Sequence, residues 1–312
     1  LYNINKIIKG GQFMNIIRKE NYTFTFSNSN KPVSFIKPGN NIVFETHDCM
    51  CSQISCETDN LDGIDFDKVN PATGPLYIEG AMPNQTLKVT VQSIYLDNYG
   101  VAMTGPGVGV LGEKLDKMTH NILNIKKNSA IFKNIELPLN KMIGVIGVAP
   151  NSEPINCGTP GSHGGNMDCK VIGEGSIVYL PIYTPGALLS VGDVHAVMGD
   201  GEIGVSGAEV GAKVDLNVEL ISNFKINNPI VETDDAYYTI ASAQTLDDAY
   251  KIAVEDMFEI LLSKCSLSKN DLIMLMSLTC DIEVCQVVDP LKTIRYKIKK
   301  EILKKLNVDK LI

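Results

Sequence analysis

The chain has 312 residues and a formal net charge of −8, with 44% hydrophobic and 21% charged residues. These proportions are typical of a globular protein with a sizeable core, so they exclude wholesale disorder. The acidic balance disfavours binding to nucleic-acid phosphates, which needs many cationic side chains on one face. No apolar run approaches the roughly 20 residues of a membrane-spanning helix. We therefore expect neither a nucleic acid nor a membrane among the partners.

The N-terminal segment carries no apolar stretch of the signal-peptide kind, and Met14 is a natural starting residue. We interpret residues 1–13 as an N-terminal extension and leave them out of the fold prediction. The eight cysteines form no C-x-x-C pair, which predicts free thiols and a cytoplasmic location. A structural zinc site made of His47 and the cysteines at positions 49, 51 and 56 is a weaker alternative, because that spacing is unusual for zinc.

The first two-thirds of the chain has the pattern of short strands separated by turns. Runs rich in β-branched and aromatic residues predict strands at 21–26, 33–36, 41–46, 87–91 and 176–181. Residues 213–220 alternate without a break, with Val214 and Leu216 on one face and Asp215 and Asn217 on the other. This period of two predicts a half-buried antiparallel strand.

The last quarter changes to a helical period. Thr245 with Asp248, and Ser268 with Asp271, are capping boxes that predict helix starts, and a strand is expected at 282–288. Strands followed by helices predict an α+β fold that is rich in β-structure, with antiparallel sheets in a sandwich or barrel-like arrangement. We expect a β-rich catalytic region at 14–222 and a smaller, helix-containing region at 223–312 packed on it.

A glycine-rich segment at 107–112 matches the dinucleotide fingerprint G-x-G-x-x-G, but the match has the wrong context. The fingerprint needs a hydrophobic strand before it, a helix after it and an acidic residue about 20 positions on. Here Thr104, Gly105 and Pro106 precede it, and no suitable acid follows. A turn that approaches a ligand is the better interpretation, and no nucleotide cofactor is expected.

The segment from Gly161 to Glu209 holds two of the four histidines among glycines and acids. Glycines let the backbone turn sharply, so Asp168, His195 and the acids at 200 and 202 can converge on one point. Imidazole with carboxylates is a usual ligand set for zinc or another divalent metal. The alternative is that the acids cap turns and the histidines pack in the core, since no fixed ligand spacing is present.

Asp168 and His195 are separated by the strand predicted at 176–181. The Pro185-Gly186 pair predicts a reversal of the chain after that strand. We therefore expect both residues at the same end of one sheet, with Glu202 brought in by the turn at 199–201.

At these motifs the chain resembles the acetamidase/formamidase family. The segments that carry the resemblance run in order from about residue 35 to 299: Asp48, Val69–Pro75, Ile78–Ala81, Gly164–Asp168, Leu180–Ala187, Val191–Asp193, His195–Glu202 and Gly207–Glu209. Met198 stands where many members have Gln, and Pro83-Asn84-Gln85 replaces the commoner Pro-Gly-Asp.

The resemblance implies a metal-dependent amidohydrolase that cleaves short amides such as formamide or acetamide to carboxylate and ammonia. It also implies a homo-oligomer, a dimer or larger, and a divalent metal for which zinc is favoured. The expected metal ligands are Asp48, Asp168 and His195. Glu202 is expected to act as general base and acid, with His163 and Asp200 as further catalytic residues. The expected substrate contacts are Gly164, Gly165, Asn166 and Glu209, and Asp200 and Glu209 are also candidates for additional ligands.

Two other functions stay open at this point. Cys169, Lys170 and Glu174 have the residue types of a metal-free Cys-Lys-Glu amidase, although in such enzymes they come from distant segments. The second alternative is a non-catalytic β domain that binds a metal or a ligand. The sequence does not identify which amide is the substrate or which metal is bound.

Overall fold

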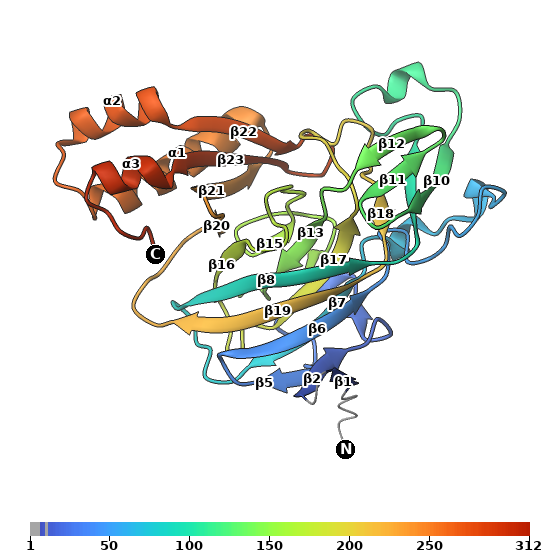
Figure 1. Ribbon diagram of the computed structural model, residues 1–312, viewed down its shortest axis with the longest axis horizontal. Coiled ribbons are helices and arrows are strands. Elements are labelled where there is room, and N and C mark those ends of the chain that lie inside the picture. Colours follow the sequence, from blue (N-terminus) through green and yellow to red (C-terminus); the bar gives the residue numbers. More distant parts are fainter. Residues whose placement is uncertain (1–6, 10–11) are drawn as a thin grey trace.

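The computed structural model describes residues 7–9 and 12–312, and most of its strands lie in two large sheets (Figure 1). The first sheet has ten strands, in the spatial order β1 (Ile7–Lys9), β2 (Gln12–Ile17), β6 (Asn40–Thr46), β19 (Ala212–Ile221), β8 (Thr86–Leu96), β16 (Ile177–Pro181), β20 (Ile230–Glu232), β21 (Ala236–Ala243), β23 (Lys292–Lys299) and β22 (Asp281–Gln286). All neighbours are antiparallel except β2 and β6.

The second sheet has eleven strands; Glu209 lies on one of them, and Asp168, Asp200 and Glu202 lie in segments that follow its strands. Its main path is β12 (Ile135–Pro138), β11 (Ser129–Phe132), β10 (Thr119–Ile125), β9 (Tyr99–Thr104), β18 (Glu209–Val210), β17 (Leu189–His195), β13 (Met142–Gly147) and β15 (Gly164–Asn166). Beside this path, β7 (Ala72–Ile78) pairs with β17, β3 (Tyr22–Thr23) and β5 (Ser34–Ile36), and a separate pair is formed by β4 (Thr25–Phe26) and β14 (Ile155–Asn156).

One hydrophobic core joins the two sheets, because buried side chains of both belong to the same cluster. Phe44 and Leu216 come from the first sheet, and Ile143 and Val191 from the second. On β19 the predicted alternation is present, with Val214 and Leu216 fully buried and the residues between them partly exposed. Burying an aliphatic side chain of this size contributes roughly 1.5–3 kcal/mol, so the alternation fixes which face of β19 points inward.

Three helices, α1 (Leu246–Leu262), α2 (Lys269–Thr279) and α3 (Lys300–Lys305), lie near the C-terminal strands (Figure 1). The Thr245 and Ser268 hydroxyls accept the backbone amides of Asp248 and Asp271, as the capping boxes predict. Buried residues of α1 and α2 share a second core cluster with Tyr237 and Ile298 of the sheet. The prediction of a β-rich α+β fold is thus confirmed.

The predicted segment boundaries can be placed on this architecture. The boundary after residue 13 falls inside β2, while residues 1–6 and 10–11 lie outside the described residues. The boundary at 222 lies between strands of one sheet, because β16 pairs with β20. The division into two regions stays a prediction. In the described part of the chain, no helix has the length and apolar character needed to cross a membrane.

Candidate active site

Strand β13 brings the central residues of the site together. It is buried along its whole length and pairs with β17 on one side and β15 on the other. His195 ends β17 opposite Met142, and Asp168 lies two residues beyond β15. A Cβ atom at Gly144 would collide with the Asp168 and Asp193 carboxylates. The glycine therefore leaves the space that the two acids occupy.

The topological reason we predicted for this meeting is wrong in one respect. The intervening strand, β16, belongs to the ten-stranded sheet, whereas β15 and β17 belong to the other sheet. Asp168 and His195 approach each other because β13 lies between β15 and β17. The chain crosses to the opposite layer and returns, which a single-sheet argument does not anticipate.

Three carboxylates converge on one nitrogen of His195. The Nε2 atom lies 3.0 Å from Glu209 Oε2, 3.3 Å from Asp193 Oδ1 and 3.8 Å from Asp168 Oδ1. Glu202 also joins the cluster, because one ligand-type atom from each of His195, Glu202 and Glu209 lies within 4.8 Å of the others. All five side chains are buried.

The backbone at this cluster adopts a conformation that side chains disfavour. The φ angles of Asp168, Asp193 and Glu202 are 41°, 51° and 47°, all in the left-handed region. Each such residue costs on the order of 1–3 kcal/mol and persists only where the surrounding structure holds it. Three acidic residues in this conformation around one histidine indicate a functional site.

Burial and mutual charge shift the pKa values of the cluster strongly. Burial raises the pKa of Asp168 and of Glu209 well above the ordinary carboxyl value, and it raises the pKa of Glu202 to about 8. Burial lowers the pKa of His195, but Glu209 and Asp193 outweigh it and hold the value well above the ordinary one. Burial also raises the pKa of Asp193, yet His195 outweighs it and lowers the value. The cluster thus favours a positive charge at its centre.

The donor atoms suit a divalent metal ion. Among the described residues, Asp168 Oδ1, Asp193 Oδ1, Glu209 Oε2 and His195 Nε2 are buried and have no hydrogen-bond partner. Leaving such atoms buried and unpaired is costly, and a cation that all of them contact offsets the cost. Imidazole nitrogen with carboxylate oxygen is a common zinc donor set. The residues present therefore fit a divalent cation.

A cavity of about 160 Å³ lies against the cluster. Asp168, Asp193, Glu202 and Glu209 line one part of it, and Asn166 and Asp289 line it as well. The rest of the wall is mostly apolar and includes Met50, Val69, Met103, Val108 and Met118, with Asn70 as a further polar residue. A cavity of this size takes a molecule of a few heavy atoms, since one of about 150 Å³ in another protein holds benzene.

Asp289 is a site residue that the sequence analysis missed. Its Oδ2 accepts a hydrogen bond of 3.0 Å from Asn166 Nδ2, and burial together with the Asp168 charge raises its pKa well above the ordinary value. It follows strand β22, more than 80 positions after Glu202. The one local signal is an acid before Pro290 in a turn, which is too common a pattern to indicate a site.

Asp193 and Cys49 were also not predicted as ligands. The Cys49 thiol, Asp193 and Glu209 form a further group of donor atoms within 4.8 Å of one another. Asp48, the ligand predicted in this segment, belongs to none of the donor groups among the described residues. Its Oδ1 accepts the Ser52 amide at 3.1 Å instead. The sequence located the strand end correctly, but the residue that faces the cluster is the next one along.

Asp200 lies apart from the cluster that it was predicted to join. Its carboxylate accepts two hydrogen bonds of 2.8 Å from Arg295 and contacts Lys170 Nζ at 2.8 Å. Burial raises its pKa, but these cations outweigh it and lower the value. The side chain is therefore held as a paired carboxylate, outside the groups of donor atoms around His195.

His163 is buried, and its environment differs from that of His195. Neither ring nitrogen has a hydrogen-bond partner within the described chain, and the ring packs edge-on against Phe26 with centroids 5.0 Å apart. Burial lowers its pKa to about 4. Gly164 and Gly165 form the start of β15 through their backbone, and neither they nor His163 line the 160 Å³ cavity. Of the predicted substrate contacts, Asn166 and Glu209 do line it.

The other sequence alternatives can also be located. Cys169 is fully buried, Lys170 is paired with Asp200, and the Glu174 carboxylate binds Lys141, so the three groups do not face one another. The His47 ring contacts Ser52, and no donor group of the described residues combines it with cysteines. The eight cysteines, all in the described part, are free. In the segment 107–112, Val108 lines the cavity, as expected of a turn near a ligand.

Comparison with known proteins decides the family. The sequence profile described as the Acetamidase/Formamidase family matches residues 26–158 and 153–303. The chain belongs to the acetamidase/formamidase family. The predicted resemblance is therefore confirmed.

Solved structures named for this family share the fold. A predicted acetamidase/formamidase from Thermoanaerobacter tengcongensis is 46% identical, with a TM-score of 0.92 over 94% of this chain and 98% of that one. An acetamidase from Bacillus halodurans is 42% identical, with a TM-score of 0.92 over 94% and 100%. A Schizosaccharomyces pombe protein with a provisional formamidase assignment is 25% identical over 250 residues. That match covers 60% of this chain and 61% of the relative, so it spans less than two thirds of the relative's length.

Proposed function

We propose that the protein hydrolyses short linear amides, such as formamide or acetamide, to a carboxylate and ammonia. The observation that carries the proposal is the convergence on His195 Nε2 of three buried carboxylate oxygens that lack a hydrogen-bond partner, in a chain of the acetamidase/formamidase family. The adjoining cavity of about 160 Å³ supports small substrates. Its apolar wall suits a methyl group, and its acidic part suits the polar carboxamide.

The proposal includes a divalent metal, for which we favour zinc. Asp168, Asp193, His195 and Glu209 would hold it, and Cys49 is close enough to two of them to contribute. When bound, such an ion polarises a carbonyl and lowers the pKa of water to about 7. The four side chains would hold the ion at one point, because Asp193 and His195 lie on β17, Glu209 lies on β18 and Asp168 lies two residues beyond β15.

Glu202 is our candidate for general base and acid. It lies beside His195 and Glu209 and lines the cavity. The carboxylate takes a proton from the attacking water and returns it to the nitrogen of the leaving amine, which must be protonated to depart as ammonia. Burial raises the pKa of Glu202 to about 8. A cation bound nearby would favour the ionised carboxylate, which is the form that a general base needs.

Ammonia release from a panel of primary amides tests the proposal directly. We expect turnover of formamide, acetamide or propionamide, and weaker turnover of longer amides as the chain outgrows the cavity. The panel also includes a lactam, whose hydrolysis opens the ring to an amino acid without releasing ammonia, so its turnover is followed by chromatography of the product. Absence of turnover across the panel, in protein shown to contain metal, would favour the alternative of a non-catalytic binding domain.

The metal-free cysteine amidase is tested by Cys169→Ser. Cys169 is fully buried and does not line the cavity of about 160 Å³. We therefore expect turnover of the variant to stay within about threefold of the wild type, because the proposed reaction does not use the sulfur as a nucleophile. Loss of activity with metal content intact would support the thiol mechanism.

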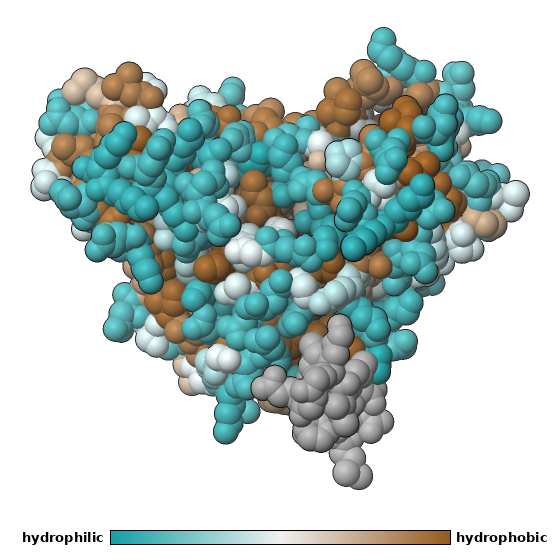
Figure 2. Space-filling model, viewed as in Figure 1, coloured by the Kyte–Doolittle hydropathy of each residue, from teal (hydrophilic) through white to brown (hydrophobic). Residues whose placement is uncertain are grey.

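We further propose a cytoplasmic homo-oligomer, a dimer or larger, without nucleic-acid or membrane partners. Exposed apolar side chains on α2, Ile273, Met274 and Leu278, support an interface between subunits. Apolar surface is visible at that corner in Figure 2, as it is at other places on the same face. Light scattering on the purified protein measures the mass, and a monomer at micromolar concentration would contradict this part of the proposal.

A further inference from the structure

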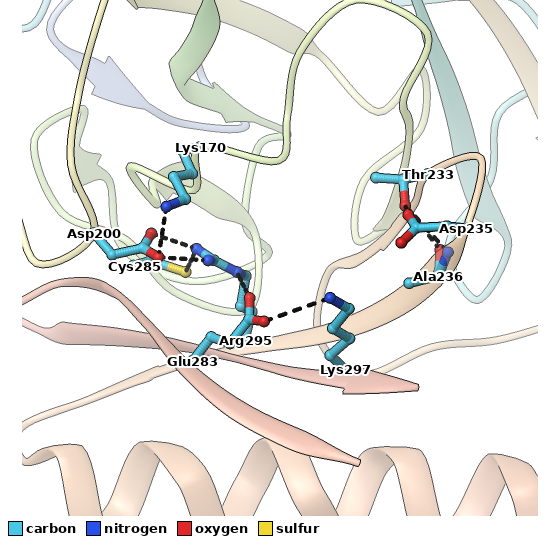
Figure 3. A network of polar contacts seen from close by, with 9 residues as sticks. All are labelled: Lys170, Asp200, Thr233, Asp235, Ala236, Glu283, Cys285, Arg295 and Lys297. Carbon is cyan, nitrogen blue, oxygen red and sulfur yellow. Dashed lines mark hydrogen bonds and ion pairs between the residues drawn. The ribbon is translucent and has the colours of Figure 1, made fainter. Parts of the chain in front are cut away.

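Arg295 on β23 is a buried cation outside the donor cluster, and all three of its guanidinium nitrogens donate hydrogen bonds. Its side chain is 2% exposed, and its two terminal nitrogens donate to the two oxygens of Asp200 at 2.8 Å each. Its Nε donates to Glu283 at 2.6 Å, and Nη1 lies 3.8 Å from the Cys285 sulfur. Figure 3 shows these contacts, together with Lys170, which also reaches the Asp200 carboxylate. A bidentate arginine–carboxylate pair fixes orientation as well as distance.

Asp200 begins the turn that carries Glu202, and the backbone of that turn is tied to the same hairpin. The Gly201 amide donates to the Cys285 carbonyl at 2.8 Å, and the Val287 amide donates to the Gly201 carbonyl at 3.1 Å. Gly201 and Gln286 therefore form a parallel bridge between the turn and β22. The turn has one charged and two backbone attachments to a hairpin that lies more than 80 residues further along the chain.

The attachment to the hairpin supports the backbone conformation of Glu202. Its φ of 47° is disfavoured for a residue with a side chain, and the next residues, Ile203 and Gly204, are not in a strand or helix. Without external support, such a turn relaxes toward more populated backbone conformations. The hairpin supplies such support through the Asp200 side chain and the Gly201 backbone.

The same hairpin also leads to Asp289, a second residue that lines the cavity. The Gln286 side chain accepts the Val288 and Asp289 amides at 2.9 and 3.0 Å, which orders the turn after β22. Asp289 then accepts a hydrogen bond from Asn166. One rigid element thus contacts the site at two points.

We propose that Arg295 is a positioning residue, which holds the Asp200–Glu202 turn so that the Glu202 carboxylate faces the donor cluster. The inference rests on the proposed function, in which Glu202 transfers the proton. Arg295 itself lines neither the 160 Å³ cavity nor any donor group, so it acts through Asp200 and the turn.

The test compares Arg295→Met and Arg295→Lys with Arg18→Met as the matched control. Arg18 is the other arginine of the chain, and it pairs with Glu45 at 2.7 Å on a half-exposed edge. For Arg295→Met we expect kcat to fall by roughly 10²-fold, which is what a 1 Å misplacement of a catalytic group costs. KM and metal content should stay within about twofold of wild type, since the donors sit on other strands. Arg295→Lys keeps one ion pair and should lose roughly tenfold.

A purely structural role is separated by the double variant Arg295→Met/Asp200→Asn. It removes one of the two carboxylates that lose their arginine partner in the single variant, so part of the lost melting temperature should be recovered. The positioning account predicts that kcat stays low, whereas recovery of kcat with stability would overturn it. If Arg295→Met does not fold, Arg295→Lys decides, and wild-type kcat in that variant would likewise overturn the inference.

Amide hydrogen exchange tests this inference independently of the proposed function. In Arg295→Met we expect faster amide exchange in residues 199–205 and unchanged exchange in β13 and β17. If the wild type turns over no amide while this local change occurs, the proposed function fails and the role of Arg295 in holding the turn stands. Wild-type activity with unchanged exchange at 199–205 in the variant would overturn the inference alone.

Discussion

Two buried histidines lie near opposite ends of β13, and they differ in the groups that face their rings. His163 adjoins the end of the strand, where its carbonyl accepts the Val148 amide, and His195 pairs with Met142 at the start. Both are at most 1% exposed. Burial alone lowers the pKa of His163 to about 4, so it is neutral, whereas neighbouring acids raise the pKa of His195 well above its ordinary value. Burial therefore does not distinguish a functional histidine, but the groups that face it do.

Replacing each histidine in turn tests whether the two differ in function, and here we expect the largest effect. We expect His195→Asn and Asp168→Asn to lose bound metal and to reduce turnover by roughly 10³-fold or more, because a metal supplies several kcal/mol to such a reaction. His163→Gln should keep its metal and stay within about threefold of wild-type turnover, since no contact of its ring reaches the cavity. Metal analysis and an ammonia assay on the same preparations check both. A large loss of turnover in His163→Gln with metal intact would restore its predicted catalytic role.

The second prediction concerns the division of labour around His195. Glu202→Gln should retain metal and reduce kcat by roughly 10²–10⁴-fold, the usual contribution of general acid–base catalysis. The amide keeps the size of the side chain but cannot accept and return a proton. If this variant instead loses its metal, Glu202 is a ligand and the base lies elsewhere in the cluster.

Two glycines of β13 provide a matched pair for the third prediction. A Cβ at Gly144 would collide with Asp168 and Asp193, and one at Gly147 would lie 2.7 Å from the Gly165 amide and 2.9 Å from the His163 carbonyl. Both alanine variants should lose roughly 1–3 kcal/mol of stability from overpacking. Only Gly144→Ala should also lower turnover, by roughly 10²-fold, because it displaces the acids. Equal loss of activity in both variants would mean that the two ends of β13 are not functionally distinct.

The regular elements and the general location of the site could be predicted from the sequence. The capping hydroxyls of Thr245 and Ser268 and the alternation along β19 act within a few residues, so local patterns reveal them. The glycine-rich segments around Asp168 and His195 indicated where chemistry would be found.

The remaining features depend on contacts between distant positions. Asp200 is two residues from Glu202, yet its partner Arg295 lies 95 positions away and turns its carboxylate out of the site. Asp289 enters from the C-terminal hairpin for the same kind of reason. At 48–49 both residues are buried, but Cys49 joins a donor group while Asp48 accepts the Ser52 amide, and the sequence alone does not show which of the two faces the cluster.

The smallest expected effect concerns His163 and the pH dependence of the free energy of unfolding. The unfolded chain binds a proton on His163 below pH 6.5, and the folded chain does so only below about pH 4. Stability from this group is therefore present above pH 6.5 and is lost as the pH falls toward 4. The difference amounts to about 3 kcal/mol, at roughly 1.4 kcal/mol for each pKa unit. Urea unfolding of metal-free wild type and His163→Gln at pH 7.5 and 4.5 measures it, and an identical pH dependence in the two would refute this assignment.

The most direct test of the account is the metal content of protein purified without chelator, measured together with ammonia release before and after exhaustive EDTA treatment. We predict a divalent ion bound in proportion to the protein, loss of ion and activity together on chelation, and recovery of both with Zn²⁺ or a similar ion. Full activity in chelated protein with no detectable metal would contradict the assignment of Asp168, Asp193, His195 and Glu209 as a metal site.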